Sequence, residues 1–169
     1  MKKILMVSAV LLAICLTLSA VSADDGWSFN FSSSDSSNSD GGEMSFENGK
    51  LKLQGIELTI PDGYKENESA QKLAVDTTDV QDAKASICEF IKDGKDILVK
   101  VFFFPDDADK EFTNITPGDG EVQKKIGDID GYYSENKYND STPTFRFIKD
   151  GKLVEVNAPD DDTIASVIK

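Results

Sequence analysis

Three two-residue turn signals constrain the fold of this chain more than any other feature. The dipeptides Asn48-Gly49, Asp93-Gly94 and Asp150-Gly151 each lie between two apolar runs. Asn-Gly and Asp-Gly readily adopt the consecutive positive φ angles of a type I′ turn, which joins adjacent antiparallel strands. The sequence therefore predicts three β-hairpins. Their strands are Met44–Glu47 with Leu51–Leu53, Ala85–Ile91 with Ile97–Phe104, and Thr144–Lys149 with Leu153–Asn157.

The spacing of apolar residues predicts which of these strands have one buried face and which have two. In the third hairpin, Phe145 and Phe147 are two residues apart, as are Val154 and Val156, and polar residues lie between them. This alternation is typical of strands with one face in a core. The segment Ile97–Phe104 is apolar on both faces apart from one lysine. It therefore predicts a central strand that is covered on both sides.

Weaker signals add further elements between the hairpins. Ile56–Ile60 predicts a strand, and Glu121–Ile126 is expected to turn back into Tyr132-Tyr133 as a fourth hairpin. The segment Asp106–Phe112 fits a short helix or a loop, and residues 70–75 have no assignment.

The C-terminus predicts a short amphipathic helix. Asp160, Asp161 and Asp162 precede Thr163–Ile168, and carboxylates are favoured at a helix start by its free amide groups and its dipole. Apolar residues then recur three and four positions apart. The expected fold class is α+β, a mainly antiparallel sheet built from hairpins with the C-terminal helix packed on it.

The first 23 residues have the pattern of a secretory signal peptide. Two lysines precede the apolar stretch Ile4–Ala20, and the small residues Val21–Ala23 supply a cleavage site. Two alternatives stay open. The apolar run has about the minimum length for an uncleaved membrane anchor. Cys15 would carry the lipid of a lipoprotein, although Ile14 stands where glycine or alanine is usual.

The chain therefore divides into three parts. Residues 1–23 are the predicted signal, and residues 24–42 are rich in Ser, Asp, Asn and Gly with few apolar side chains. Such a segment cannot offset its ordering entropy by burial, so we expect a flexible tether. Residues 43–169 form the single compact α+β domain. Cleavage after residue 23 leaves Cys88 as the only cysteine, so no internal disulfide is expected.

Charge and missing residue types exclude several functions. Asp and Glu total 31 against 18 Lys and Arg, for a formal charge of −13, so nucleic acid phosphates would be repelled. The chain has no histidine, which excludes Ser-His-Asp and Cys-His catalysis and His-ligated zinc. The glycine-rich nucleotide-binding motifs are also missing. The sequence indicates no cofactor, no metal and no catalytic residue.

Acidic clusters are the remaining candidates for chemistry. The run from Asp106 to Glu111 alternates carboxylates like a calcium loop, yet Phe112 stands where an EF-hand needs glycine and Gly118 where it needs glutamate. Solvated turns on an acidic protein are the simpler interpretation. An irregular calcium site and a carboxylate pair for glycoside hydrolysis stay open as alternatives. Cys88 lies in an apolar strand and is expected to be a buried, unreactive thiol.

Two sets of residues are candidate sites on the surface. Four Asn-x-Ser/Thr sequons predict N-glycosylation, although Asn and Ser also cluster in turns for conformational reasons. Their asparagines are Asn30, Asn67, Asn114 and Asn139. Three tyrosines, Tyr132, Tyr133 and Tyr138, would form a binding surface if their rings were exposed together.

Several turn and helix-start segments carry a family resemblance. They are Gly55–Tyr64, Ile129–Tyr133, Thr144–Phe147, Lys149–Leu153 and Ala158–Ile164. Together they resemble small secreted proteins of uncharacterised function from methanogenic archaea, over most of residues 43–169. The strand that ends in Pro61–Tyr64 also resembles the opening of the PsbP/Mog1-like sheet proteins. These resemblances imply an exported sheet domain and no catalytic residue.

Two functions from different classes follow. The first is an exported, non-enzymatic domain of the cell surface or extracellular space that binds an envelope or extracellular partner. It would contact the membrane only through an uncleaved N-terminal segment. The alternative is a small envelope hydrolase that depends on carboxylates, with calcium as an assisting ion.

Overall fold

Two antiparallel sheets and one short α-helix make up the part of the chain that the structure describes. The structure is a computed structural model, and it describes residues 43–78, 80–107, 109–135 and 142–169. The predicted signal peptide and tether lie outside these residues. All described residues belong to one of the two compact units of the chain, Asn38–Lys169. None of the described helices is long and apolar enough to cross a membrane.

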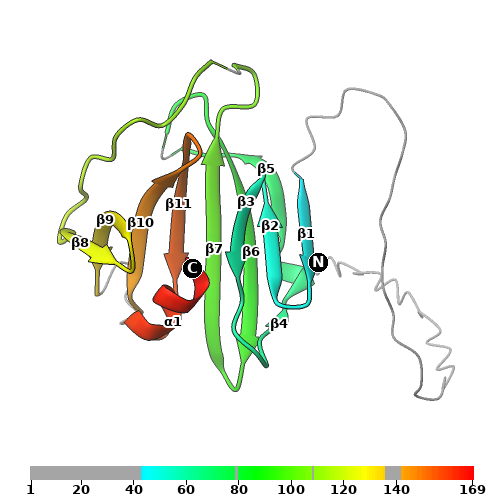
Figure 1. The fold of residues 1–169 in the computed structure, drawn as a ribbon. Helices are drawn as coiled ribbons and strands as arrows, with labels where there is room; N and C mark the ends of the chain where they lie inside the picture. The colour runs from blue at the N-terminus through cyan, green and yellow to red at the C-terminus, as the bar shows by residue number, and fades with distance from the viewer. Residues whose placement is uncertain (1–42, 79, 108, 136–141) are drawn as a thin grey trace, which may run out of the picture. The chain divides into compact units, whose positions relative to one another are not determined.

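The small sheet contains the strands nearest the N-terminus, and the large sheet contains all others (Figure 1). The small sheet has the order β1 (Met44–Glu47), β2 (Lys50–Leu53) and β3 (Ile56–Thr59). The large sheet contains β4 (Lys65–Glu66), β5 (Lys72–Asp76), β6 (Lys84–Lys92), β7 (Lys95–Phe103), β8 (Val122–Ile126), β9 (Ile129–Ser134), β10 (Thr144–Lys149) and β11 (Lys152–Asn157). A 3₁₀ turn (Glu68–Ala70) precedes β5, and α1 (Asp161–Val167) follows β11.

The predicted hairpins are confirmed, and backbone angles show why they form. The strand pairs β1–β2, β6–β7, β10–β11 and β8–β9 are antiparallel in the expected registers. At Asp93-Gly94 the φ angles are 51° and 73°, the two positive values of a type I′ turn. A further turn of this kind, Gln54-Gly55 with φ angles of 52° and 78°, joins β2 to β3. Glutamine is not a typical turn residue, so the sequence did not predict this turn.

The mainly antiparallel sheet and its C-terminal helix are confirmed, but hairpins alone do not build the large sheet. Its order is β4-β6-β7-β11-β10-β9-β8, and β5 pairs with β6 beside β4. The central pair therefore joins strands that are far apart in the chain, with Val154 opposite Val101. Residues 70–75, which had no assignment, fall largely into the edge strand β5. The segment 106–112 forms no helix in its described residues.

The main core lies on the face of the large sheet that the small sheet and α1 cover (Figure 1). Phe145, Phe147, Val154 and Val156 are fully buried there, as their two-residue spacing predicted. The inward residues of the small sheet and Ile164 of α1 pack into the same cluster. Apolar burial is the main stabilising term for a domain that contains no disulfide among its described residues.

The opposite face of the large sheet carries a charged row beneath a long connection. Lys100 of β7, Glu155 of β11 and Arg146 of β10 are direct cross-strand neighbours. The connection from β7 to β8 covers part of this face, because Phe112 and Ile115 pack on a second, smaller apolar cluster. Lys100 Nζ lies 3.0 Å from Glu155 Oε1, and both side chains are largely buried. The lysine that interrupts the apolar pattern of β7 therefore has a buried partner.

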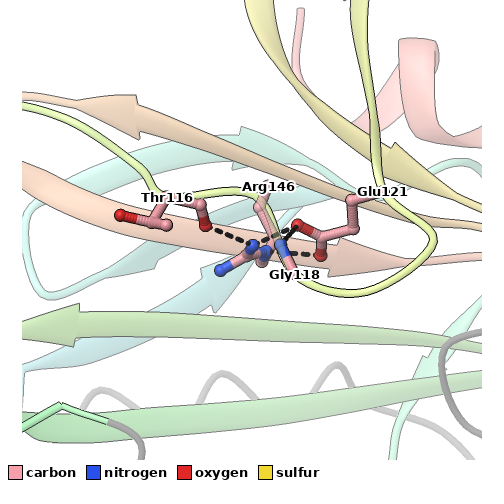
Figure 2. Close-up of polar contacts among 4 residues, drawn as sticks. All are labelled: Thr116, Gly118, Glu121 and Arg146. Atoms are coloured by element: carbon pink, nitrogen blue, oxygen red, sulfur yellow. Dashed lines mark hydrogen bonds and ion pairs between the residues drawn. The ribbon is translucent and has the colours of Figure 1, made fainter.

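Arg146 is the only arginine of the chain, and it holds the end of this connection against the sheet (Figure 2). Its Nε donates to Glu121 Oε1 at 2.8 Å, and its Nη2 donates to Glu121 Oε2 and, at 3.2 Å, to the carbonyl oxygen of Thr116. The amide of Gly118 also donates to Glu121 Oε2 at 2.8 Å. The Glu121 side chain is only 2% exposed. A bidentate arginine–carboxylate pair of this kind orients both partners.

The C-terminal helix begins at Asp161, so the predicted start is two residues late. Asp160 is the N-cap, and Asp161 and Asp162 lie in the first turn. Ile164 and Val167 are buried, which confirms the expected apolar face. Lys124 Nζ of β8 lies 2.5 Å from Asp161 Oδ2, and this hydrogen bond holds the pKa of Asp161 below its ordinary value. The helix is thus attached to the sheet by both apolar and ionic contacts.

Replacing the N-cap Asp160 by alanine is expected to lower the free energy of unfolding by about 1 kcal/mol at neutral pH. Asp160 Oδ1 accepts hydrogen bonds from the Thr163 hydroxyl at 2.6 Å and from the Thr163 amide at 2.8 Å. These bonds lower the pKa of Asp160 from its ordinary 3.8. The cap therefore stabilises the fold fully above that value, and its contribution is lost as the pH falls through the folded-state pKa.

Urea unfolding at several pH values checks this prediction. The difference between wild type and Asp160→Ala should shrink as the solution is acidified below the ordinary pKa of aspartate. Asp160→Asn is the matched control, because asparagine caps helices about as well as aspartate and does not titrate. A difference that stays constant or grows in acid would contradict the role assigned to the carboxylate.

Candidate functional site

A groove in the described part of the chain lies on the outer side of the small sheet. Its volume is about 570 Å³, within the range of ordinary ligand sites. We call it the lysine groove, and it is lined by Ser45, Glu47, Asn48, Lys50, Leu51, Lys52, Glu57, Leu58, Thr59, Lys149 and Lys169.

Strand alternation explains the polar lining of the lysine groove. The small sheet turns the side chains of Leu51, Leu53, Ile56 and Leu58 into the core, where they are fully buried. The alternate residues of each strand therefore project away from the core. They form two cross-strand rows, Ser45–Lys52–Glu57 and Glu47–Lys50–Thr59. Polar groups on neighbouring strands thus lie side by side along the groove.

Two lysines from distant parts of the chain complete the groove. Lys149 ends β10, and its Nζ donates to the carbonyl oxygen of Glu57 at 3.0 Å. Lys169 follows the C-terminal helix, which contacts β3. The groove therefore depends on the reach of the Lys149 side chain and on the contact of α1 with β3, and not on the small sheet alone.

Several ammonium groups of the groove have only neutral partners among the described residues. Lys50 Nζ donates to the Thr59 hydroxyl at 2.9 Å, and Lys149 donates to a backbone carbonyl. Lys52 is different, because its Nζ lies 3.6 Å from Glu43 Oε1. Four lysines and two glutamates line the groove. Ammonium groups therefore outnumber carboxylates among the lining side chains, although Glu43 beside Lys52 offsets one of them, on a chain whose formal charge is −13.

The described carboxylates do not gather into a metal centre. No group of three or more cysteine, aspartate or glutamate side chains is placed to hold an ion, within the residues that the structure describes. The two well-buried glutamates, Glu121 and Glu155, are each paired with a cation, Arg146 and Lys100 respectively. A carboxylate held by a close cation favours its ionised form, which does not suit the proton donor of a glycosidase.

Cys88 lies in the core, which confirms the predicted burial. Its side chain is fully buried in β6, and its Sγ lies 3.3 Å from the Met44 sulfur. Burial is the main cause that raises the pKa of the Cys88 thiol to about 12. The reactive form of cysteine is the thiolate, so this environment does not suit a nucleophile.

The two described sequons have different surroundings. Asn67 is partly buried, and its Nδ2 donates to Glu89 Oε2 at 2.5 Å. A glycan would replace one of the two hydrogens on that nitrogen. Asn114 is exposed in the connection between β7 and β8. Asn30 and Asn139 lie outside the described residues, and glycosylation at all four sites stays a prediction.

The two described tyrosines of the predicted binding surface, Tyr132 and Tyr133, point to opposite faces of the large sheet. Tyr133 points into the main core and is 7% exposed, and burial raises its pKa. Tyr132 is the next residue of β9 and therefore points to the opposite face, where it lies beside Arg146. Tyr138 lies outside the described residues. The two described rings, Tyr132 and Tyr133, therefore do not lie side by side.

Sequence reasoning missed the lysine groove, although a local signal for half of it was present. The alternation Lys50-Leu51-Lys52-Leu53 shows two lysines on one face of a strand. The residues that complete the groove are about 100 positions further along the chain, and no local pattern connects them to this strand.

No family model, curated protein or solved structure matches the chain. The functional argument therefore rests on the fold and on this groove.

Proposed function

We propose that this chain is an exported, non-enzymatic binding domain that holds an acidic partner from the cell envelope or the extracellular space in the lysine groove. One observation carries the proposal. Lys50, Lys149 and Lys169 line one groove, and the partners of the Lys50 and Lys149 ammonium groups among the described residues are neutral. The proposal for export rests on the signal-like pattern of residues 1–23.

Electrostatics explains why an acidic partner suits this groove. Two unit charges 4 Å apart attract by about 4 kcal/mol at the effective dielectric constant near a protein surface. The rest of the chain is strongly acidic and repels anions at long range. An anionic partner is therefore favoured at the groove over most other parts of the surface, and its binding should weaken as salt is added.

The hydrolase alternative has less support. A retaining or inverting glycosidase needs two carboxyl groups that face each other across the substrate. Glu47 and Glu57 are the carboxylates of the groove, and each is a cross-strand neighbour of a lysine. We therefore favour binding over catalysis for this site.

Sedimentation with isolated native envelopes tests the proposed function. The purified protein, with the N-terminus that its own cells leave on it, is compared with the double variant Lys50→Gln/Lys149→Gln. We expect the apparent affinity to fall at least about tenfold in the variant, which is 1.4 kcal/mol of binding free energy. Glutamine keeps a hydrogen-bond donor at each position and removes only the charge.

A matched control separates the groove from the total charge. The double variant Lys72→Gln/Lys125→Gln removes the same charge from two exposed residues outside the groove. It should bind envelopes like the wild type. Equal losses in both double variants, or no sedimentation of the wild type, would reject the groove as the binding site. Recovery of the unprocessed chain from the soluble interior of the cells would reject export.

A further inference from the structure

We infer that the lysine groove takes an acidic polysaccharide, in which each carboxylate is carried by its own sugar ring and is separated from the next carboxylate by uncharged hydroxyl groups. This inference rests on the proposed function and names the chemical class of its partner. Four features of the groove support this inference. They are the type of its cations, its neutral polar groups, its own carboxylates and the lack of aromatic side chains among its lining residues.

The cations of the groove are all lysines. A lysine ammonium acts as a compact point charge with three donors, whereas arginine binds two oxygens of one phosphate or carboxylate in a fixed fork. The only arginine of the chain, Arg146, is occupied by Glu121 on the other face of the large sheet. The groove is therefore suited to single, separated anionic groups and not to planar bidentate recognition.

Neutral hydrogen-bonding groups lie between these charges. Thr59 accepts a hydrogen bond from Lys50 at 2.9 Å, and its hydroxyl can also donate to a ligand. Ser45 and Asn48 line the same groove. Hydroxyl and amide groups of this kind match sugar hydroxyls, which both donate and accept. Lysines that alternate with such groups fit a polymer in which charged and uncharged groups also alternate.

The two glutamates of the groove limit the charge density of its ligand. Glu47 lies across from Lys50 and Glu57 lies across from Lys52 in the two cross-strand rows. A polymer whose anionic groups follow one another directly along its backbone, such as polyphosphate, would place anions against these carboxylates, and like charges at close range repel. A polymer whose carboxylates are separated by hydroxyl groups can place its carboxylates at the lysines and its uncharged hydroxyl groups beside the two glutamates.

The lining also argues against nucleic acids. Single-stranded nucleic acids bind grooves in which bases stack on aromatic side chains. The lysine groove contains no phenylalanine, tyrosine or tryptophan among its lining residues. Its volume of about 570 Å³, together with the solvent exposure of most of its side chains, suits a short stretch of a longer chain that continues beyond both ends.

Affinity electrophoresis with polygalacturonate tests the inference on the purified protein. The matched polymer is methyl-esterified polygalacturonate, which has the same sugar chain with its carboxylates neutralised, and inorganic polyphosphate is the dense polyanion. We expect polygalacturonate to retard the protein at low salt and the esterified polymer to bind at least tenfold more weakly. Polyphosphate should also bind more weakly than polygalacturonate.

Variants locate the binding on the protein. Lys50→Gln/Lys149→Gln should weaken polygalacturonate binding at least tenfold, and Lys72→Gln/Lys125→Gln should change it less than twofold. Urea midpoints of both variants should match the wild type, which excludes misfolding as the cause. Equal binding of the esterified polymer, tighter binding of polyphosphate, or equal losses in the two variants would overturn the inference.

The two proposals fail in different ways. If envelopes bind through the groove and polygalacturonate does not bind, the inference of an acidic polysaccharide ligand is wrong and the proposed binding function stands. If polygalacturonate binds through the groove and envelopes do not bind, the ligand chemistry stands and the assignment to the envelope is wrong.

Discussion

Replacing Arg146 by leucine is expected to lower the free energy of unfolding by about 3–5 kcal/mol. The arginine is the bidentate partner of Glu121, whose side chain is 2% exposed, and the arginine side chain itself is 15% exposed. Removing one partner of a buried ion pair leaves the other charge desolvated without its counter-ion, which costs far more than the intact pair contributes. The variant also loses the hydrogen bond to the carbonyl oxygen of Thr116.

Urea denaturation measures this effect without adding salt that would screen the charges. Lys110→Met is the matched control, because Lys110 pairs with Asp82 at 3.4 Å with side chains that are 41% and 66% exposed. We expect a loss below about 0.5 kcal/mol there, as for other exposed pairs.

A double variant tests whether the loss of stability comes from the Glu121 charge that remains buried after Arg146 is removed. Arg146→Leu/Glu121→Leu removes both charges, and it should recover most of the stability that the single variant loses. If the single variant costs no more than Lys110→Met, then the Arg146–Glu121 pair does not hold the connection in solution as it does in the structure.

Replacing Gly131 by alanine is expected to cost about 3 kcal/mol or more, the upper part of the range for overpacked sites. A Cβ atom at Gly131 would lie against the carbonyl oxygen of Arg146 and 2.7 Å from two ring carbons of Phe145. The first obstacle is the backbone of the neighbouring strand, and the second is a fully buried ring. Neither can move without disturbing the pairing of β9 with β10, so the strain cannot be relieved locally.

Gly118→Ala is the matched control for this substitution. Its Cβ would make only ordinary van der Waals contact, 3.5 Å from the Glu121 carboxyl group, and its amide would still donate to Glu121. We expect a change below about 1 kcal/mol. Thermal unfolding followed by circular dichroism compares the two variants. Similar melting temperatures for both would show that β9 and β10 can separate without a large penalty.

Much of the strand layout was predictable because its causes are local. The φ angles of Asn48-Gly49 and Asp150-Gly151 depend on the residues themselves, so the dipeptides identify the turns before any packing is known. The alternation of Phe145 and Phe147 identifies a buried face for the same reason. The turn at Gln54-Gly55 escaped prediction because glutamine, unlike asparagine and aspartate, is not enriched at positive φ angles.

The candidate site was less predictable, because local sequence patterns do not show which distant residues lie close together in the folded chain. Lys50 and Lys52 occupy one face of β2 by simple alternation. Lys149 joins them only because the tertiary fold brings the end of β10 near β3, so that its ammonium group reaches the carbonyl oxygen of Glu57. The predicted tyrosine surface illustrates the same limit, since neighbouring residues of a strand point to opposite faces.

By itself, the sequence determined the hairpin turns, the buried faces of the strands, the acidic helix start and the absence of histidine chemistry, because each depends on a residue type or on a spacing of a few residues. The tertiary structure alone decided that β11 pairs with β7, that Glu121 lies against Arg146, and that distant lysines share one groove. Burial of one common core selects these contacts, and no short window of sequence contains that core.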